Sequence, residues 1–185
     1  MPQPILETER LILRLPQADD LDGWSRLMAD EAASLFIGGP MDRTGAWANL
    51  CLMRGAWDIE GFSNFSVIEK ATGRWIGRAG PWSPPGWPGR EIGWAFLREV
   101  WGRGFAKEAA QASMAWAWQS LGWREAVHII HPDNLRSIAL AKAIGSEFKM
   151  SLEAGRLGSK TPLQVFGQTL HGAVMEDRNC VSVRF

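Results

Sequence analysis

The stretch Phe96–Ala110, FLREVWGRGFAKEAA, decides the fold, because an apolar strand ends in it and a long helix begins in it. Small residues recur at helical spacing after its two glycines, which predicts a helix over 104–121 that packs tightly on a sheet. The N-terminus of such a helix presents unpaired N–H groups and favours anions. Gly102 and Gly104 would let a ligand approach the backbone, and Arg103 would add a cation. The spacing fits an anion site and a strand-to-helix turn that needs glycines for its geometry equally well.

The rest of the sequence predicts strands and helices in the order β-α-α-β-β-β-α-β-α-β-β. The strands are expected over residues 8–15, 64–70, 75–79, 91–97, 125–131, 148–152 and 163–169, and the helices over 19–29, 42–55, 104–121 and 134–144. Hairpins that come first and a crossover helix after the central strand are typical of a mixed α+β sheet. We therefore expect a single domain over residues 1–185 with about seven mostly antiparallel strands and about four flanking helices. An irregular loop is expected over 80–89 and a loose tail over 170–185.

The composition excludes several classes of protein. Lys and Arg number 20 and Asp and Glu number 20, so the formal net charge is zero, which argues against nucleic acid or an anionic membrane as a partner. No apolar run approaches the ~18 residues that a membrane-spanning helix needs. Met1–Pro4 lacks the basic region and apolar stretch of a secretory signal, so a cytoplasmic protein is expected.

Residues that could ligate a metal are few. Cys51 and Cys180 are the only cysteines, and two such distant thiols form neither a zinc cage nor a disulfide framework. His128 and His131 fall three residues apart in a predicted strand, on opposite faces, and make a poor metal pair. We therefore expect no metal site.

One segment of the deciding stretch points to a known family. Trp101–Ala109, WGRGFAKEA, resembles the acetyl-CoA pyrophosphate loop of the GCN5-related N-acetyltransferase (GNAT) superfamily, whose motif is Q/R-x-x-G-x-G/A. Gly104 and Ala106 match this motif, and Trp101 replaces the usual Gln or Arg. The variant W-G-x-G-x-A is typical of the branch that resembles ribosomal-protein N-terminal acetyltransferases.

Three further segments fit the same branch in the same order. Glu7–Arg14 (ETERLILR) resembles its opening strand, and Glu91–Trp94 (EIGW) resembles its central strand. Asn134–Ser137 (NLRS), with Ser146–Phe148 (SEF) behind it, resembles its N-x-x-S…G-F segment. The resemblance covers residues 7–170, and four motifs in the correct order make it specific.

The resemblance implies that the fourth strand, over 91–97, splays from its parallel neighbour, the fifth strand over 125–131. The pantetheine arm of acetyl-CoA would lie in that gap, and the pyrophosphate would lie on the main-chain amides of residues 102–106. Acetyl-CoA is then the cosubstrate, and direct transfer from thioester to amine needs no metal. The implied cofactor-binding residues are Ala95, Phe96, Leu97, Trp101, Gly102, Arg103, Gly104, Phe105, Ala106, Asn134 and Ser137.

Direct transfer needs a base for the amine and a proton donor for the departing thiolate. Glu91 matches the central-strand Glu of the branch and is the implied base, directly or through a water, unless it pairs with Arg90 or another cation or caps the strand. Many superfamily members protonate the thiolate with a Tyr, but Ala141 stands at that position and the chain has no Tyr. Ser137 is then the implied donor, unless its hydroxyl bonds its own helix backbone. Asn134 either caps that helix or bonds the cofactor.

The acceptor side follows from family pattern, which places Phe36, Trp82 and Trp87 next to Glu91. The two indoles would bind an alkyl amine, an aromatic group or a cation, or they would only cover a sheet edge or a dimer contact. The sequence therefore predicts an acyltransferase that moves an acetyl group from acetyl-CoA to a primary amine of a peptide N-terminus or small molecule in a ternary complex. The alternative is a non-catalytic acyl-CoA-binding sensor module, and a homodimer is compatible with both.

Overall fold

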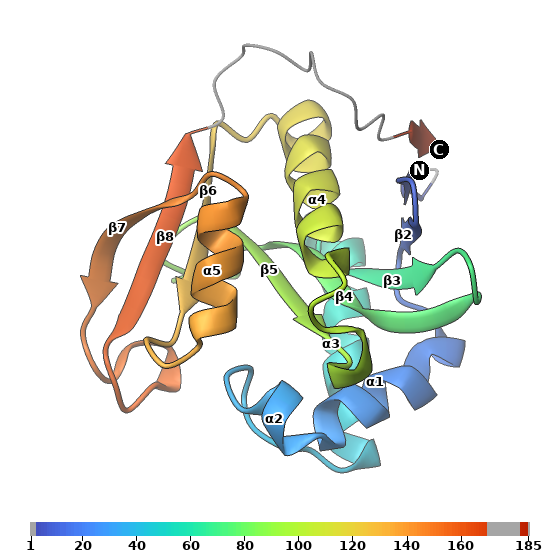
Figure 1. Cartoon of the computed structure of the whole chain (residues 1–185), viewed down its shortest axis with the longest axis horizontal. Coiled ribbons are helices and arrows are strands. Elements are labelled where there is room, and N and C mark those ends of the chain that lie inside the picture. Colours follow the sequence, from blue (N-terminus) through green and yellow to red (C-terminus); the bar gives the residue numbers. More distant parts are fainter. Residues whose placement is uncertain (1–2, 170–181, 185) are drawn as a thin grey trace.

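A computed structural model describes residues 3–169 and 182–184 of the chain. Its centre is one nine-stranded sheet in the order β7-β8-β6-β5-β4-β3-β2-β1-β9 (Figure 1). The strands are β1 Ile5–Glu7, β2 Leu11–Arg14, β3 Phe65–Glu69, β4 Arg74–Trp82, β5 Glu91–Phe96, β6 Glu125–Ile130, β7 Glu147–Leu152, β8 Leu163–Thr169 and β9 Ser182–Arg184. The helices are α1 Leu21–Ala29, α2 Glu31–Ser34, α3 Arg43–Glu60, α4 Phe105–Leu121 and α5 Leu135–Ala143, with 3₁₀ turns η1 Ala18–Asp20, η2 Arg98–Val100 and η3 Arg156–Gly158. The predicted mixed α+β class is confirmed.

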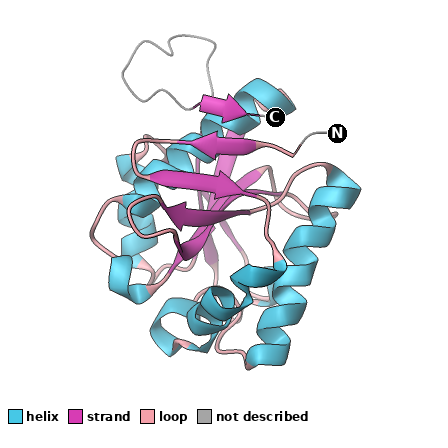
Figure 2. Ribbon diagram, turned by 90° about the vertical axis from the view of Figure 1, so that its right-hand side faces the viewer, coloured by secondary structure: helices cyan, strands magenta, loops and turns pink. Residues whose placement is uncertain are grey.

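Helices cover both faces of the sheet (Figure 2). On one face lies α4, whose Trp116 packs edge-on against Phe65 with ring centroids 5.2 Å apart. On the other face α1 packs beside α3, and its Trp24 lies 5.4 Å from Trp75 on β4. All four rings are buried, so the hydrophobic effect holds the helices on each face in place.

The neighbouring strands β5 and β6 are parallel, and they separate after one register pair, Glu91 opposite Val127. They run apart toward their C-terminal ends (Figure 1). On its other side β5 pairs with β4 along its whole length, from Glu91 opposite Trp82 to Phe96 opposite Gly77. The predicted splay is therefore confirmed, and we call the space between the diverging strands the β5–β6 gap.

The strand predicted over 8–15 is confirmed as β2, Leu11–Arg14, but it begins later than predicted, and a separate antiparallel strand, β1, precedes it at Ile5–Glu7. Thr8 closes the turn between them. Its N–H donates to the Leu11 carbonyl (3.0 Å), and its hydroxyl oxygen accepts from the Leu11 N–H (3.0 Å). Alternation of apolar residues does not reveal a turn that a threonine side chain closes without Gly or Pro.

The irregular loop predicted over 80–89 begins too early, because β4 extends to Trp82. Pro81 lacks the N–H that a central strand normally donates. It is tolerated because β3 ends at Phe65, opposite Ala79, so no strand on that side needs the missing donor.

Besides β1, the sequence prediction lacks the short helix α2 and the strand β9. Asp30 caps the short helix α2, because its Oδ1 accepts from the N–H groups of Ala32 (3.0 Å) and Ala33 (3.2 Å). The segment 170–185, which was expected to be a loose tail, contains the strand β9, and β9 pairs with β1. The rest of that segment lies outside the described residues. The strand count exceeds the predicted seven because β1 and β9 are added.

Candidate active site

The glycine loop, residues 101–104, joins η2 to α4. Gly102 and Gly104 both have left-handed backbone, with φ of 75° and 81°, a conformation that glycine adopts without strain. The first main-chain bond of α4 runs from the N–H of Glu108 to the carbonyl of Gly104 (3.1 Å). The N–H groups of the first helical turn therefore have no acceptor within the helix, and the turn is able to bind an anion.

Glu108 anchors this first turn to the N-terminal segment. Its Oε1 accepts from the Thr8 hydroxyl (2.6 Å) and the Arg10 N–H (2.9 Å), and its Oε2 accepts from Arg10 Nε (2.7 Å). Partial burial pushes the pKa of Glu108 upward, but these hydrogen bonds and the Arg10 charge outweigh it and hold the pKa below its ordinary value. Two motifs far apart in sequence, Glu7–Arg14 and Trp101–Ala109, thus form one structural unit.

The side chains of the glycine loop connect it to its surroundings. Arg103 Nη2 lies 3.0 Å from Glu69 Oε1, while the Arg103 side chain stays 53% exposed. Trp101 Nε1 donates to the Phe96 carbonyl at the end of β5 (2.9 Å). The guanidinium of Arg136 on α5 lies 4.3 Å from the centre of the Trp101 ring. This cation–π contact joins the segment after β5 to the helix after β6.

Two hydrogen bonds fix the direction in which the main chain of β5 faces. The N–H of Leu97 donates to the Ile76 carbonyl of β4 (3.0 Å), and the N–H of Val127 on β6 donates to the Arg90 carbonyl (2.9 Å). Successive residues of a strand point their main-chain groups to opposite neighbours. Odd-numbered residues of β5 therefore face β4, and even-numbered residues face β6 or the β5–β6 gap.

This alternation shows which of the β5 residues predicted to bind the cofactor turn their main-chain groups toward the β5–β6 gap. Phe96 turns its main-chain groups toward the gap, whereas Ala95 and Leu97 turn theirs toward β4. Trp94 also faces the gap with its main chain and was not predicted. The sequence could not supply this assignment, because the register between β4 and β5 determines it.

Glu91 stands where the gap begins. Its Oε2 accepts from Trp87 Nε1 (2.7 Å), and its Oε1 accepts from the N–H of Ile129 on β6 (3.1 Å). Burial raises the pKa of Glu91 to about 7, although both hydrogen bonds and the charge of Arg78 lower it. A carboxylate whose pKa lies near neutrality is well matched to general-base chemistry.

Two arginines lie near this carboxylate. Arg78 on β4 donates to Asn64 Oδ1 (2.5 Å), and burial lowers the pKa of Arg78 to about 10 while the Glu91 charge raises it. Arg90, which the sequence offers as an ion-pair partner for Glu91, instead lies 5.7 Å from the centre of the Trp123 ring. Arg78 is therefore the cation whose charge acts on Glu91.

The N-terminus of α5 is linked to β5. Asn134 caps this helix, because its Oδ1 accepts from the N–H of Ser137 (3.2 Å). The Ser137 hydroxyl oxygen accepts from Trp94 Nε1 on β5 (3.2 Å), which leaves the hydroxyl hydrogen available for donation elsewhere. Ala141, at the position where many family members carry Tyr, is fully buried.

Aromatic residues predicted for the acceptor side lie around Glu91 and at the end of β6. Trp82 is the register partner of Glu91 on β4, and its ring packs edge-on against Trp87 at 6.5 Å. Trp82 also lines a groove of about 410 Å³ between α3 and the start of the proline-rich loop, the segment 83–90 that joins β4 to β5. Phe36, from the segment after α2, stacks on His131 directly after β6, with ring centres 5.0 Å apart.

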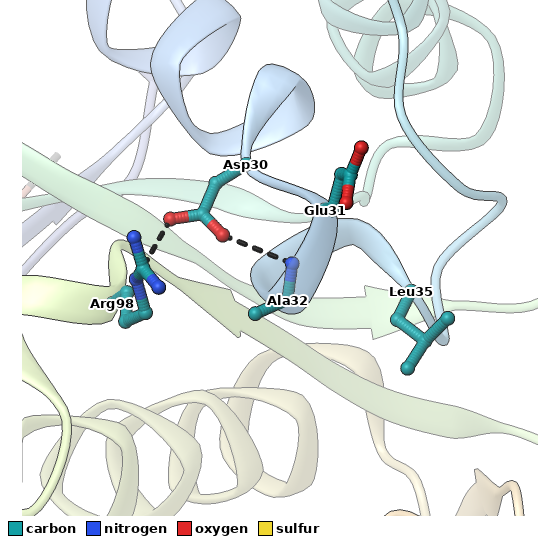
Figure 3. A pocket seen from close by; sticks show the side chains of 5 residues that line it. All are labelled: Asp30, Glu31, Ala32, Leu35 and Arg98. Carbon is teal, nitrogen blue, oxygen red and sulfur yellow. Dashed lines mark hydrogen bonds and ion pairs between the residues drawn. The ribbon is translucent and has the colours of Figure 1, made fainter.

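A second hollow, of about 590 Å³, lies beside the end of β5 (Figure 3). It is lined by Asp30, Glu31, Ala32, Leu35 and Arg98. Arg98 Nε pairs with Asp30 Oδ2 at 3.1 Å, and the same carboxyl group caps α2 through Ala32. The Asp30 carboxylate thus joins α2 to the turn η2 that follows β5.

His128 is a central residue that sequence reasoning missed, since it was considered only as a metal ligand. Its side chain is 1% exposed, and its ring lies 4.8 Å from that of Trp94. One polar residue inside the apolar segment EAVHII is the signal that could have singled it out.

Neither a metal cluster nor a membrane segment is found in the described part of the chain. Within residues 3–169 and 182–184, no three His, Cys, Asp or Glu residues are grouped so that they could hold a metal ion. No helix in the same residues is long and apolar enough to cross a membrane.

The fold and the glycine loop match a known family. A family model described as the acetyltransferase (GNAT) domain matches residues 10–147. The chain belongs to the GNAT acetyltransferase family. The matched region includes the glycine loop, the central strand with Glu91 and the helix that Asn134 caps, so the resemblance that the motifs indicated is confirmed.

Relatives of this acetyltransferase occur in bacteria. It is 31% identical over 142 residues to the uncharacterized N-acetyltransferase p20 of Bacillus licheniformis, which covers 75% of this chain and 80% of that protein. The crystal structure of an acetyltransferase from Agrobacterium tumefaciens str. C58 is similar, with a TM-score of 0.77, 30% identity and coverage of 91% of this chain and 94% of that one. The ribosomal L7/L12 alpha-N-protein acetyltransferase RimL, in complex with coenzyme A, has the same fold at a TM-score of 0.73 and 15% identity, with 89% and 98% of the two chains covered. This likeness shows a shared fold.

Proposed function

We propose that this GNAT domain is an acetyl-CoA-dependent N-acetyltransferase that transfers the acetyl group directly to a primary amine of a peptide N-terminus or a small molecule. Family membership supports acetyl transfer. The observation that carries the proposal is the position of Glu91, a carboxylate of near-neutral pKa held at the point where β5 and β6 separate. Acetyl-CoA supplies the activated thioester, and the remaining chemistry is proton transfer.

The chain offers main-chain groups that fit the two polar parts of coenzyme A. The first turn of α4 presents N–H groups and a partial positive charge, which suit the pyrophosphate. The main chain of Trp94 and Phe96 faces the gap and suits the amides of the pantetheine arm. Arg103 within the glycine loop and Arg136 beside it add positive charge.

Glu91 acts as the general base in this proposal. The amine nitrogen attacks the thioester carbonyl, a C–N bond forms, the C–S bond breaks, and Glu91 receives the proton of the amine, directly or through a water. Hydrogen bonds from Trp87 and Ile129 hold both carboxylate oxygens, so the base has a fixed orientation. Trp82, Trp87 and Phe36 are proposed to bind the acceptor beside it.

Ser137 stabilises the leaving group in this proposal. Its hydroxyl oxygen accepts from the Trp94 indole N–H, so its own hydrogen is free to form a hydrogen bond to the departing thiolate. The thiolate then takes its proton from solvent water, and Glu91 returns the proton of the amine to solvent. The hydroxyl takes the place of the Tyr that many family members use, where this chain has the buried Ala141.

The experiment that tests the proposal measures the release of coenzyme A thiol from acetyl-CoA with a panel of acceptors. The panel contains short peptides with free N-termini, polyamines, amino acids and aminoglycosides. We expect the release of coenzyme A to depend on both substrates, and we expect an acetylated acceptor in the mass spectrum. The lines in double-reciprocal plots of initial rate against substrate concentration should intersect, as a ternary complex requires. Parallel lines would indicate an acetyl-enzyme intermediate and contradict direct transfer.

A non-catalytic acyl-CoA sensor is the second candidate, favoured by the missing Tyr at Ala141. Thermal unfolding with acetyl-CoA, beside ATP and NAD as controls, separates binding from turnover. Acetyl-CoA at ~100 times its Kd adds roughly 2.7 kcal/mol of stability. For a chain of this size that raises Tm by about 5 to 10 °C. A rise without turnover on any acceptor would favour the sensor, and no rise would contradict both candidates.

A further inference from the structure

The main-chain hydrogen bonds between the parallel strands β5 and β6 end where two side chains take the place of the next bond. After the rung from Val127 N–H to the Arg90 carbonyl, the next rung of a parallel ladder would join the N–H of Ile129 to the carbonyl of Ile92. That rung is not made. The N–H of Ile129 donates to the Glu91 carboxylate (3.1 Å), and the Ile92 carbonyl lies 2.7 Å from His128 Nδ1. Each strand thus receives a side-chain partner in place of the other strand.

The surroundings of His128 define its protonation. A carbonyl oxygen only accepts hydrogen bonds, so Nδ1 carries the hydrogen and donates to Ile92. Nε2 is then an acceptor and receives the hydroxyl hydrogen of Ser146 (2.9 Å), whose oxygen accepts from Gln168 Nε2 (2.8 Å). Burial lowers the pKa of His128 to about 4, so the imidazole stays neutral at ordinary pH.

We propose that His128 is a positioning residue that holds the sheet open at the acyl-transfer centre, by occupying the Ile92 carbonyl that Ile129 would otherwise take. The proposal rests on the proposed function. With Ile92 occupied, the N–H of Ile129 remains available to Glu91 and orients the base. The Ile92 carbonyl and the Ile129 N–H each keep a hydrogen-bond partner, so the break in the ladder leaves neither of these two groups unpaired.

The loss of His128 therefore has a chemical consequence as well as a packing consequence. Without its donor, the Ile92 carbonyl recruits Ile129, the gap shortens by one rung, and Glu91 loses the main-chain bond that lowers its pKa. The charged group that faces Glu91 is Arg78 on β4, and its neutral partner is Trp87 in the proline-rich loop. The side chains in contact with the His128 ring, Trp94 and Ser146, are uncharged.

A matched pair of variants tests the role of the Nδ1 donor. His128→Asn keeps an N–H near the position of Nδ1, whereas His128→Leu has nearly the same shape and no donor. We expect the crystal structure of His128→Leu to show Ile129 N bonded to the Ile92 carbonyl at ~2.9 Å. The His128→Asn structure is expected to keep the bond of Ile129 to Glu91.

Measurements of acetyl-CoA binding and of the pH dependence of kcat/KM then show whether His128 positions groups of the site or only stabilises the fold. For His128→Leu we expect the Kd of acetyl-CoA to rise about tenfold, and the acidic-limb pKa of kcat/KM to move upward. His128→Asn should keep both values close to those of the wild type. Ser66→Ala is the stability control, because Ser66 is a buried hydroxyl with two hydrogen-bond partners, Asp20 and Trp75, on the face of the sheet that α1 covers. It should lower Tm and change neither Kd nor pKa.

Three results would overturn the inference. The first is a His128→Leu structure in which Ile129 still bonds Glu91. The second is a His128→Leu variant whose Tm falls as that of Ser66→Ala does, while the Kd of acetyl-CoA and the acidic-limb pKa of kcat/KM stay unchanged. The third, useful if His128→Leu does not fold, is an imidazole nitrogen NMR spectrum of the wild type in which Nε2 rather than Nδ1 carries the hydrogen. If the wild type binds no acetyl-CoA, the proposed function fails, yet the NMR spectrum and the variant structures still decide the role of His128.

Discussion

The glycine loop and the centre of the β5–β6 gap, the two halves of the proposed active site, are built in different ways. The glycine loop consists of neighbouring residues, and its proposed binding groups are backbone N–H groups at a helix N-terminus. The gap centre brings Glu91, Trp87, His128 and Ile129 together from two strands and a loop, and three side chains and the Ile129 N–H form its hydrogen bonds. The first half depends on backbone conformation, and the second depends on pairing register and on the state of titratable groups.

This difference predicts how each half fails. Backbone N–H groups survive most substitutions nearby, so only a change at a left-handed glycine or in the anchor of α4 should damage the glycine loop. A side-chain site loses function when one donor or acceptor is removed, and its activity should respond to pH. The variants below break the two halves separately.

The largest effect is expected for Glu91→Gln. The amide keeps the shape of the side chain and cannot accept the proton of the amine, so kcat should fall roughly 100- to 10,000-fold. The Kd of acetyl-CoA, measured by calorimetry, should stay near the wild-type value. The wild-type rate should decline as pH falls below about 7, the pKa of Glu91, and the variant should lack this limb. A variant that retains both rate and limb would exclude Glu91 as the base.

Glu91 also links folding stability to pH. Its pKa of about 7 in the folded chain exceeds the ordinary value of 4.5, so between these values the folded state holds a proton that the unfolded state has released. The stability contribution is fully present below pH 4.5 and is lost as pH rises through 7. Glu91→Gln lacks this titration, so the Tm of the variant minus that of the wild type should increase by roughly 2 to 8 °C between pH 5 and pH 8. A difference that stays constant over this range would contradict the linkage.

The glycine loop should fail next, in Gly104→Asp. This change places a Cβ at φ +81° and a negative charge beside the anion-binding turn, so the Kd of acetyl-CoA should rise about 100-fold or more. Gly73→Asp is the matched control, because Gly73 has φ +66° in the turn between β3 and β4, where a Cβ meets nothing within 4 Å. Both variants should lose a similar stability of about 1 kcal/mol. Equal Kd values for the two would remove the glycine loop from the binding site.

The two halves also differ in how far the sequence predicted them. The glycines and the helix start of the glycine loop were predicted, because these are local features, and the anion-binding role of the loop stays a prediction. Glu91 and the nearby Trp87 were predicted from the resemblance, but the hydrogen bonds of Glu91 to Trp87 and Ile129 and the position of His128 were not, since these contacts depend on which strands pair and in what register. Trp94 was missed for the same reason, and Ala95 was assigned to the gap although the alternation turns its main chain to β4.

Local patterns also set the limits of the fold prediction. The class, the order of the main elements and the splay were predicted, because hydrophobic periodicity marks each long element. The turn at Thr8 was missed, since a hydroxyl closes it without Gly or Pro. The extension of β4 through Pro81 was missed, because a proline is excluded only where a neighbouring strand needs its N–H.

The anchor of the glycine loop should affect stability more than chemistry. Glu108→Ala removes the acceptor of three hydrogen bonds from Thr8 and Arg10, so the free energy of unfolding should fall by about 2 kcal/mol, measured by urea titration. Because the pKa of Glu108 is lowered in the folded chain, its contribution is present above the ordinary carboxyl pKa and is lost as pH falls through the lower folded value. The difference between wild type and variant should therefore shrink in acid. A constant difference would mean that Glu108 stabilises the turn by packing alone.

The smallest effect is expected at the gap centre, for Trp87→Phe. The change removes the indole N–H from Glu91 Oε2 and keeps an aromatic ring, so the pKa of Glu91 should rise above about 7. At pH 7 kcat/KM should fall about two- to fivefold, and it should recover near pH 9 because the carboxylate is then ionised again. Trp82→Phe is the control: its ring packs on Trp87, so it should change the KM of the acceptor and leave the acidic-limb pKa in place. A loss in Trp87→Phe that persists at high pH would show that the indole binds the acceptor rather than setting the base, and would move Trp87 from the proton-transfer half of the site to the recognition half.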